Sequence, residues 1–340
     1  MNAVSSVLKS ATACPVDYRY SASVFRRAPS LVADTVYVVG GLYGNVEALH
    51  EILRMQEAEA RAGRRVELVF NGDHNWFDVD AASFREINEA ALAGTSIRGN
   101  VEAEIAQPSD GGCGCNYPDY VNAEYVARSN AIMRRLQRTA AEFSDIRQRL
   151  GALPMTRTIE VGGERVGIVH GDAELLSGWS FAAESLSPNG RSCSGDEATA
   201  ELTPRETIDR IFRDADVTAF ASSHTCLPHA RDYGVDGRPR LLMNNGSSGI
   251  PNFTGAPFGI VTRISSDPTV PADSLYGITV RGARFDAVPV RFDQRKWLGR
   301  FLANWQPGSP GYEAYYKRLV GGPAFELADA IGGLVARVAG

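Results

Sequence analysis

The segment from Val36 to Leu53 (VYVVGGLYGNVEALHEIL) constrains the possible folds more than any other part of the chain. It begins with four β-branched or aromatic residues and breaks at two glycines, and Asn45 then precedes apolar residues that recur at helical spacing. A buried strand, a glycine-rich turn and an amphipathic helix in this order are typical of an α/β layered domain. Because such folds place ligands at the carboxyl ends of their strands, we expect residues 40–45 to face a functional site.

Composition narrows the class of protein and its partners. The 340 residues are 44 % apolar and 22 % charged, as in a soluble globular protein, and no apolar run reaches the 18 residues of a membrane span. The formal net charge of −5 gives no reason to expect a nucleic acid polymer or an anionic membrane as partner. Five cysteines do not form a disulfide framework, and no signal-peptide-like stretch is present, so we expect reduced thiols and a cytoplasmic location.

The chain is expected to contain one large domain with short additions. Residues 1–30 are interpreted as an N-terminal extension and residues 31–320 as the domain. Within that domain, residues 107–150 are expected to form a helical cap insertion and the serine-rich residues 173–203 a lid loop. A C-terminal helix is expected over 321–340. The pattern predicts strands at 36–39, 66–70, 95–98, 217–220, 241–243, 260–264 and 283–290, a hairpin at 156–169, and helices at 81–92, 120–150 and 204–214.

Five of the predicted strands end in a polar cluster: GGLYGN at 40–45, GD at 72–73, GN at 99–100, HGD at 170–172 and SHTC at 223–226. Four of these residues, Asp73, Asn100, His170 and His224, offer one carboxylate oxygen, one amide oxygen and two imidazole nitrogens. This donor set suits Mn, Fe, Zn, Co or Ni. The coincidence of four such residues at four strand ends predicts a metal site.

The order of these blocks resembles the signature of the calcineurin-like metallophosphoesterase superfamily, which runs D-x-H, GD, GN, H and GHxH. Residues 245–251 (NGSSGIP) also look like the NPGSVGxP stretch of its compact bacterial branch, and residues 287–293 resemble the strand that follows. The resemblance covers roughly residues 35 to 320. It implies an α/β/β/α sandwich of two mixed sheets flanked by helices.

The resemblance also implies two metal sites, of which this chain retains one. In the family the second metal is held by residues that correspond to Asp73, Asn100, His170 and His224. At the first metal site, Gly41 stands in place of the family's Asp, Tyr43 in place of one His and Cys226 in place of the other His. Only the bridging Asp73 remains. Two alternatives to a single-metal centre stay open. In one alternative, Tyr43 and Cys226 themselves ligate a metal such as Fe(III) or Zn. In the other, the Tyr43 ring fills the first site and the protein binds phosphate without hydrolysis.

The expected function is therefore metal-dependent hydrolysis of a small phosphorylated substrate, with about one transition metal per chain and Asp73, Asn100 and His224 in the catalytic centre. The alternative is an inactive phosphate- or nucleotide-binding relative. Val101 stands where many phosphoesterases have a proton-donating His, and His74 and His229 are the candidate replacements, although a structural role is favoured for both. Glu102 is expected to orient the Asn100 loop or cap its helix. The residues expected to contact substrate are Gly41, Tyr43, Asn45, Trp76 and Asn245.

Overall fold

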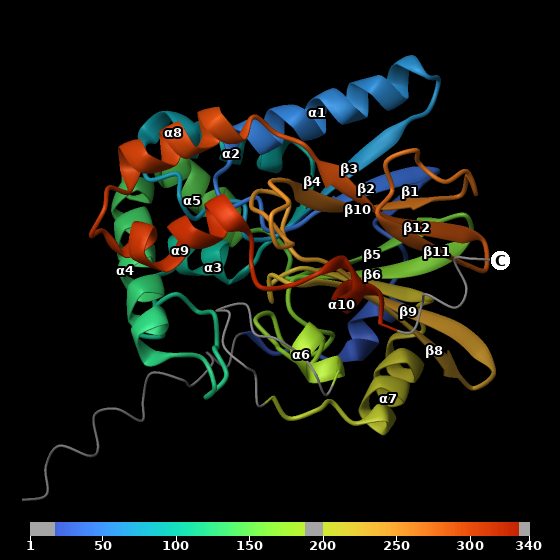
Figure 1. Ribbon diagram of the computed structural model, residues 1–340. Helices are drawn as coiled ribbons and strands as arrows, with labels where there is room; N and C mark the ends of the chain where they lie inside the picture. Colours follow the sequence, from blue (N-terminus) through green and yellow to red (C-terminus); the bar gives the residue numbers. More distant parts are fainter. Residues whose placement is uncertain (1–17, 188–199, 333–340) are drawn as a thin grey trace, which may run out of the picture.

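Two six-stranded mixed sheets pack face to face, with helices on their outer sides (Figure 1). The structure is a computed structural model that describes residues 18–187 and 200–332. The expected N-terminal extension, lid loop and C-terminal helix each lie partly outside these ranges. The expected α/β sandwich of two mixed sheets flanked by helices is confirmed.

The first sheet has the order β11-β12-β10-β2-β3-β4. Strands β2, β3 and β4 are parallel, whereas β10, β11 and β12 pair antiparallel to their neighbours. The strand bounds are β2 Thr35–Val39, β3 Val66–Asn71, β4 Thr95–Ile97, β10 Gly259–Ser265, β11 Tyr276–Val280 and β12 Ala283–Val290.

The second sheet has the order β1-β5-β6-β7-β9-β8. Its central strands β6, β7 and β9 are parallel, and β5 and β6 form the expected hairpin around Gly162 and Gly163, whose positive φ angles of 58° and 75° suit a tight turn. The strand bounds are β1 Leu31–Ala33, β5 Thr156–Val161, β6 Glu164–Val169, β7 Ala219–Ser222, β8 Pro228–Val235 and β9 Arg238–Asn245.

Strand β2 is buried on both faces, and its side chains alternate between two cores. Val36 and Val38 pack between the sheets, and Tyr37 and Val39 pack under the helices. This is why its sequence is continuously apolar. Outside the second sheet a third core contains Phe25 of the 3₁₀ helix η2 (Ala22–Arg26), so residues of the expected extension contribute to packing.

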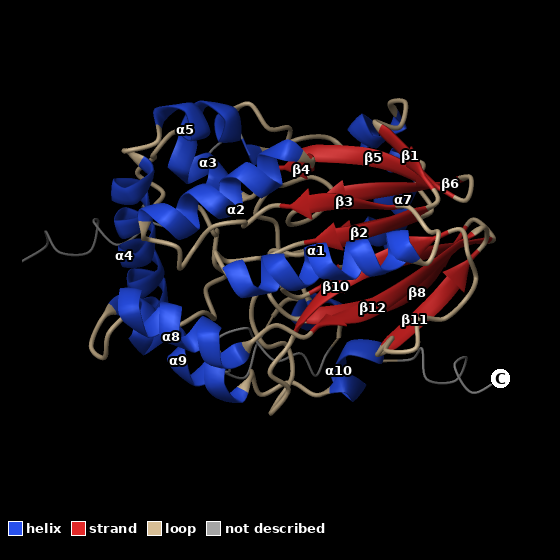
Figure 2. Ribbon diagram, turned by 90° about the horizontal axis from the view of Figure 1, so that it is seen from above, coloured by secondary structure: helices blue, strands red, loops and turns tan. Residues whose placement is uncertain are grey.

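The helices lie outside the sheets and beyond one end of them. Figure 2 shows α3, α4, α5, α8 and α9 gathered beyond the carboxyl ends of β2, β3 and β4. The region of the expected cap contains two helices, α4 and α5. No helix among the described residues is long and apolar enough to span a membrane. The helix bounds are α1 Val46–Arg61, α2 Ala81–Ala93, α3 Asn100–Ala106, α4 Ala123–Ala140, α5 Ser144–Gly151, α6 Ala183–Leu186, α7 Arg205–Ala215, α8 Gln294–Asn304, α9 Pro310–Gly321 and α10 Leu327–Ile331.

Three strands, β1, β8 and β11, were not predicted from the sequence, and β7 lies two residues later than expected. Strand β1 has only three residues, and β8 (PHARDYGV) carries charged residues and a glycine in place of an apolar run. Both lie at sheet edges, where one side of the strand has no partner in its sheet and the sequence pattern is weaker. The sheet context, rather than local pattern, defines these strands.

Candidate metal centre

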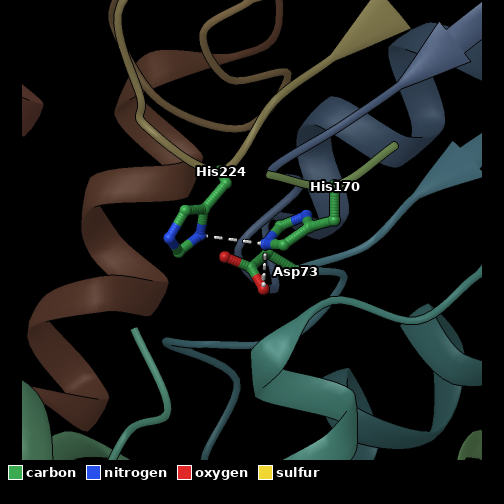
Figure 3. Close-up of side chains that lie close together, drawn as sticks. All are labelled: Asp73, His170 and His224. Atoms are coloured by element: carbon green, nitrogen blue, oxygen red, sulfur yellow. Dashed lines mark hydrogen bonds and ion pairs between the residues drawn. The ribbon is translucent and has the colours of Figure 1, made fainter. Parts of the chain in front are cut away.

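Four side chains from four separate loops converge at the carboxyl ends of the strands. Asp73 follows β3, Asn100 begins α3 just after β4, His170 follows β6, and His224 follows β7. Figure 3 shows Asp73, His170 and His224 pointing toward one another. Their potential ligand atoms lie within 4.8 Å of one another, and this is the one cluster of His, Cys, Asp and Glu within residues 18–187 and 200–332 with metal-ligand geometry.

The Nε2 atom of His170 lies at the middle of the cluster. It is 3.2 Å from Asp73 Oδ1, 3.1 Å from Asn100 Oδ1 and 3.1 Å from His224 Nδ1. All four residues are buried, with at most 5 % of their surface exposed. The structure therefore brings together the complete set that the sequence predicted as ligands of one metal.

Hydrogen bonds on the outer side of the cluster determine which atoms face inward. His170 Nδ1 lies 2.9 Å from the carbonyl oxygen of Asn71, and His224 Nε2 lies 3.1 Å from that of Cys115. A carbonyl only accepts, so each of these nitrogens carries the proton in the neutral ring, and the inner nitrogen carries a lone pair. Asn100 Nδ2 donates to the carbonyl of Cys113 at 2.9 Å, which turns its oxygen inward.

Four lone pairs thus face one another with no proton between them. Such an arrangement is repulsive unless a cation or an added proton occupies the centre. Backbone carbonyls that fix the histidine tautomers are the usual support of metal-bound imidazole. The residues present therefore fit a divalent or trivalent transition metal.

Burial and neighbouring charge act differently on the two histidines. Burial lowers the pKa of His224 well below its ordinary value, and the neighbouring His170 lowers it further. Burial also lowers the pKa of His170, but the Asp73 carboxylate, the Asn71 carbonyl and the Glu102 carboxylate together outweigh burial and raise the pKa overall. His224 is thus neutral and ready to bind a metal, whereas at His170 a metal competes with a proton.

The carboxylate of Glu102 holds the two ligand loops in place. It accepts hydrogen bonds from the backbone N–H groups of Asp73, His74 and Gly99, each at 2.8 Å. The expectation that Glu102 orients the Asn100 loop and caps its helix is confirmed. One buried side chain therefore sets the relative position of Asp73 and Asn100.

Close backbone packing beneath the cluster requires glycine at 72. Gly72 has a φ of +78°, and a Cβ there would lie 2.6 Å from both the backbone nitrogen of Gly99 and His170 Nδ1. Asp73 itself has a φ of +52°, an uncommon conformation for a non-glycine residue. The loop stores local strain at the metal centre, as functional sites often do.

Tyr43 and Cys226, which the sequence resemblance places at two ligand positions of the first metal, are hydrogen-bonded to each other. The Tyr43 hydroxyl and Cys226 Sγ are 2.8 Å apart, and Cys226 Sγ also lies 3.2 Å from the carbonyl of His224. Both residues have positive φ angles, of 53° and 62°. Burial is the largest cause that raises the pKa of each group, so both stay protonated at neutral pH.

A small pocket of about 20 Å³ opens beside the metal centre. This volume admits about one water-sized group. Asp73, His224, Tyr43 and Cys226 line it, together with Trp76, which was expected there. Cys115 also lines the pocket, and four further lining residues were not identified from the sequence: Tyr117, Tyr125, Trp179 and Tyr315.

No protein-family model matches the sequence, and no curated protein matches it. Solved structures do match. A metallophosphoesterase from Sphaerobacter thermophilus superposes with a TM-score of 0.50 at 17 % identity, covering 85 % of this chain and 99 % of the other. A hypothetical protein from Pyrococcus horikoshii superposes with a TM-score of 0.52 at 15 % identity, covering 87 % and 100 %. The chain has the calcineurin-like metallophosphoesterase fold.

In this metallophosphoesterase fold, three of the residues expected to contact substrate do not line the pocket. The amide of Asn45 caps α1 and donates to the carbonyl of Gly249 at 2.7 Å, and Asn245 donates to the carbonyl of Gly40 at 3.0 Å. Gly41 supplies a turn with a φ of +61°. The amide nitrogens of Asn45 and Asn245 therefore hold the loops around the candidate metal centre together, because they donate to backbone carbonyls.

The two candidate proton donors are also absent from the pocket wall. The buried ring of His74 packs edge-on against Phe70, and His229 is buried in strand β8 with Nε2 2.7 Å from the carbonyl of Phe181. Burial lowers the pKa of His229 to about 3. The structural role favoured for both residues agrees with these positions, and the proton-donor hypothesis gains no support.

Proposed function

We propose that this protein is a metal-dependent phosphoester hydrolase that acts on a small phosphorylated substrate. One transition metal, with Mn, Fe, Zn, Co and Ni as candidates, is held by Asp73, Asn100, His170 and His224. The observation that carries the proposal is the convergence of four inward lone pairs with no proton between them. The phosphoesterase fold supports the choice of reaction.

The bound metal would act as a Lewis acid on a phosphoryl oxygen and lower the pKa of a bound water. The protein's own residues prepare that chemistry. The carbonyls of Asn71 and Cys115 hold the two imidazole rings in the metal-binding tautomer. Asp73 contributes the negative charge that offsets part of the metal's charge.

The pocket wall supplies hydrogen-bond donors and excludes water. Burial raises the pKa of Tyr43, Tyr117, Cys115 and Cys226, so their hydroxyl and thiol groups remain protonated in the neutral range. The Tyr43 hydroxyl and the Cys226 thiol are hydrogen-bonded to each other, so either group would have to exchange a present hydrogen bond to donate to a phosphoryl or leaving-group oxygen. The surrounding rings make the pocket less polar, which strengthens these electrostatic interactions.

A second candidate function is phosphate or nucleotide binding without hydrolysis. It is favoured by the Tyr43–Cys226 pair, which occupies the place of the missing family ligands. A substrate larger than a few atoms would have to displace aromatic side chains to reach the metal.

Metal analysis together with a turnover assay separates these functions. We expect about one transition metal per chain in protein purified without added metal. We also expect hydrolysis of p-nitrophenyl phosphate or bis-p-nitrophenyl phosphate with Mn²⁺. One metal with no turnover of either ester would favour the binding function, and no metal would overturn the proposed site. Two metals would indicate that Tyr43 and Cys226 also act as ligands.

A further inference from the structure

A polar cavity lies away from the metal centre, between α3 and α5. Its volume is about 470 Å³, within the range of small-molecule sites. The two helices lie side by side in Figure 2. Tyr18, the residue that begins the described chain, closes one side. No residue of this cavity lines the pocket beside the metal centre, so it is a separate site.

Two arginines give this cavity its chemical character. Arg98 and Arg147 both line it, and neither forms an ion pair with a carboxylate of the described residues. Arg98 uses Nη1 to donate to the carbonyl of Gly151 at 3.1 Å, and its buried Nε has no hydrogen-bond partner. Arg147 donates to the carbonyls of Ile105 and Ala106 at the end of α3. Each guanidinium therefore retains Nη hydrogens that these contacts do not use, and its charge has no carboxylate partner among the described residues.

The single carboxylate in the wall forms no ion pair with either arginine. Glu104 is 1 % exposed, and its two oxygens accept from the Tyr18 hydroxyl at 2.9 Å and from the backbone N–H and hydroxyl of Ser109 at 2.9 and 2.8 Å. It is already satisfied by these three donors. Its role in the wall is to fix Tyr18 and the loop after α3.

The start of α5 adds to the positive character. Ser144 begins this eight-residue helix and lines the cavity. The preceding residue, Phe143, provides no side-chain cap for the N–H groups of the first turn. The amino end of a helix carries partial positive charge and favours anions, and Asp145 in the first turn, which does not line the cavity, offsets part of that charge. Two guanidinium groups beside it match the planar geometry of carboxylate and phosphate groups.

We propose that the cavity between α3 and α5 binds a small organic anion that carries a phosphate or carboxylate group. The site is distinct from the metal centre and does not depend on the proposed hydrolysis. Arg98 and Arg147 bind the charged group, and Ser144 and Ser109 border the rest of the ligand.

Thermal unfolding of the full-length protein tests this site, because a ligand that binds the folded state raises Tm. Citrate, inorganic phosphate and AMP serve as probes, with ionic strength held constant by NaCl. We expect at least one probe to raise Tm in the wild type and to do so still in Asp73→Asn, which disables the metal centre. The relative effects of citrate and phosphate distinguish the carboxylate from the phosphate class.

Arg98→Gln and Arg147→Gln should each lose more than half of that shift. Arg134→Gln is the matched control, since it removes one charge from an exposed position of α4 outside the cavity. The proposal is overturned if none of the probes raises Tm, or if the two cavity variants respond as fully as the control.

Ser144→Asp provides an independent variant should an arginine variant fail to fold. An aspartate at the first position of α5 is favourable for the helix and places a competing carboxylate in the cavity. We expect this variant to fold and to lose more than half of the probe-induced shift. An undiminished shift would contradict the proposal.

Discussion

The two halves of the candidate metal site differ in where their protons are. On one side, Asp73, Asn100, His170 and His224 direct lone pairs to a common point, and the protons of the rings and the amide point outward to backbone carbonyls. On the other side, Tyr43 and Cys226 are protonated and are hydrogen-bonded to each other at 2.8 Å. The first half needs a cation to offset the repulsion between its lone pairs. The second half needs none, because its two polar groups are hydrogen-bonded to each other. Ligand geometry alone therefore predicts that metal binding is confined to the first half.

Removal of a central ligand should have the largest effect. Asp73→Asn takes away the carboxylate charge and leaves an amide next to two imidazole lone pairs. We expect metal affinity to fall by at least about 100-fold, because loss of even a supporting partner typically costs 10–100-fold, and turnover should fall with it. Metal content by elemental analysis and esterase rate are the readouts. His50→Ala, on the exposed side of α1, is the control and should retain both.

Disturbance of the Glu102 carboxylate should have the next largest effect. In Glu102→Gln, the side chain presents one acceptor oxygen and one amino group to the three backbone N–H donors that the carboxylate binds. The loops of Asp73 and Asn100 would shift apart, and we expect metal affinity to fall about 10–100-fold. Isothermal titration with Mn²⁺ of Glu102→Gln, compared with Glu89→Gln at an exposed position of α2, measures this. Equal affinities in the two variants would contradict the positioning role.

Acidification should weaken metal binding by a smaller and graded amount. The pKa of His170 is raised in the metal-free protein. Its proton therefore stabilises the metal-free fold fully at pH values below the pKa that His170 has in the unfolded chain. This stabilisation is lost as the pH rises through the pKa that His170 has in the folded protein. A metal must displace that proton. Affinity should therefore drop about tenfold per pH unit below the raised pKa of His170. Titrations between pH 5 and pH 8 check the slope, and a flat profile would mean that His170 is not a ligand.

Changes on the Tyr43 side should have the smallest effect on metal binding. Tyr43→Phe removes the hydroxyl that is hydrogen-bonded to Cys226. We expect this loss to reduce the free energy of unfolding by about 1 kcal/mol. Metal affinity should stay within about twofold of the wild type. Chemical denaturation and metal titration provide the two numbers. Loss of a metal ion in this variant would establish the rebuilt-site alternative instead.

The ligand residues were predictable because each one follows a strand with a clear apolar pattern. Asp73, Asn100 and His170 are each next to a glycine that breaks such a run, and parallel strands bring their carboxyl ends together. Asn45 and Asn245 were predicted as substrate contacts from the same pattern, but the structure shows their amide nitrogens donating to backbone carbonyls. Position at a strand end does not reveal which way a side chain points.

The rest of the pocket could not be read from the sequence. Trp179 comes from the loop after β6, Tyr117 from the loop before α4, and Tyr315 from α9. Nothing in the local pattern relates these segments, which meet only through tertiary packing. His229 illustrates the same limit, because the strand that buries it was not recognised.

The carbonyl of Cys115 that holds His224 belongs to a residue that also lines the pocket beside the candidate metal centre. One residue in the loop before α4 thus takes part in both the orientation of His224 and the shape of the pocket. Under the proposed function, a lineage that altered this loop to accept a new substrate would at the same time move a metal ligand. Substrate range and metal affinity would then be coupled traits, and selection on one would constrain the other.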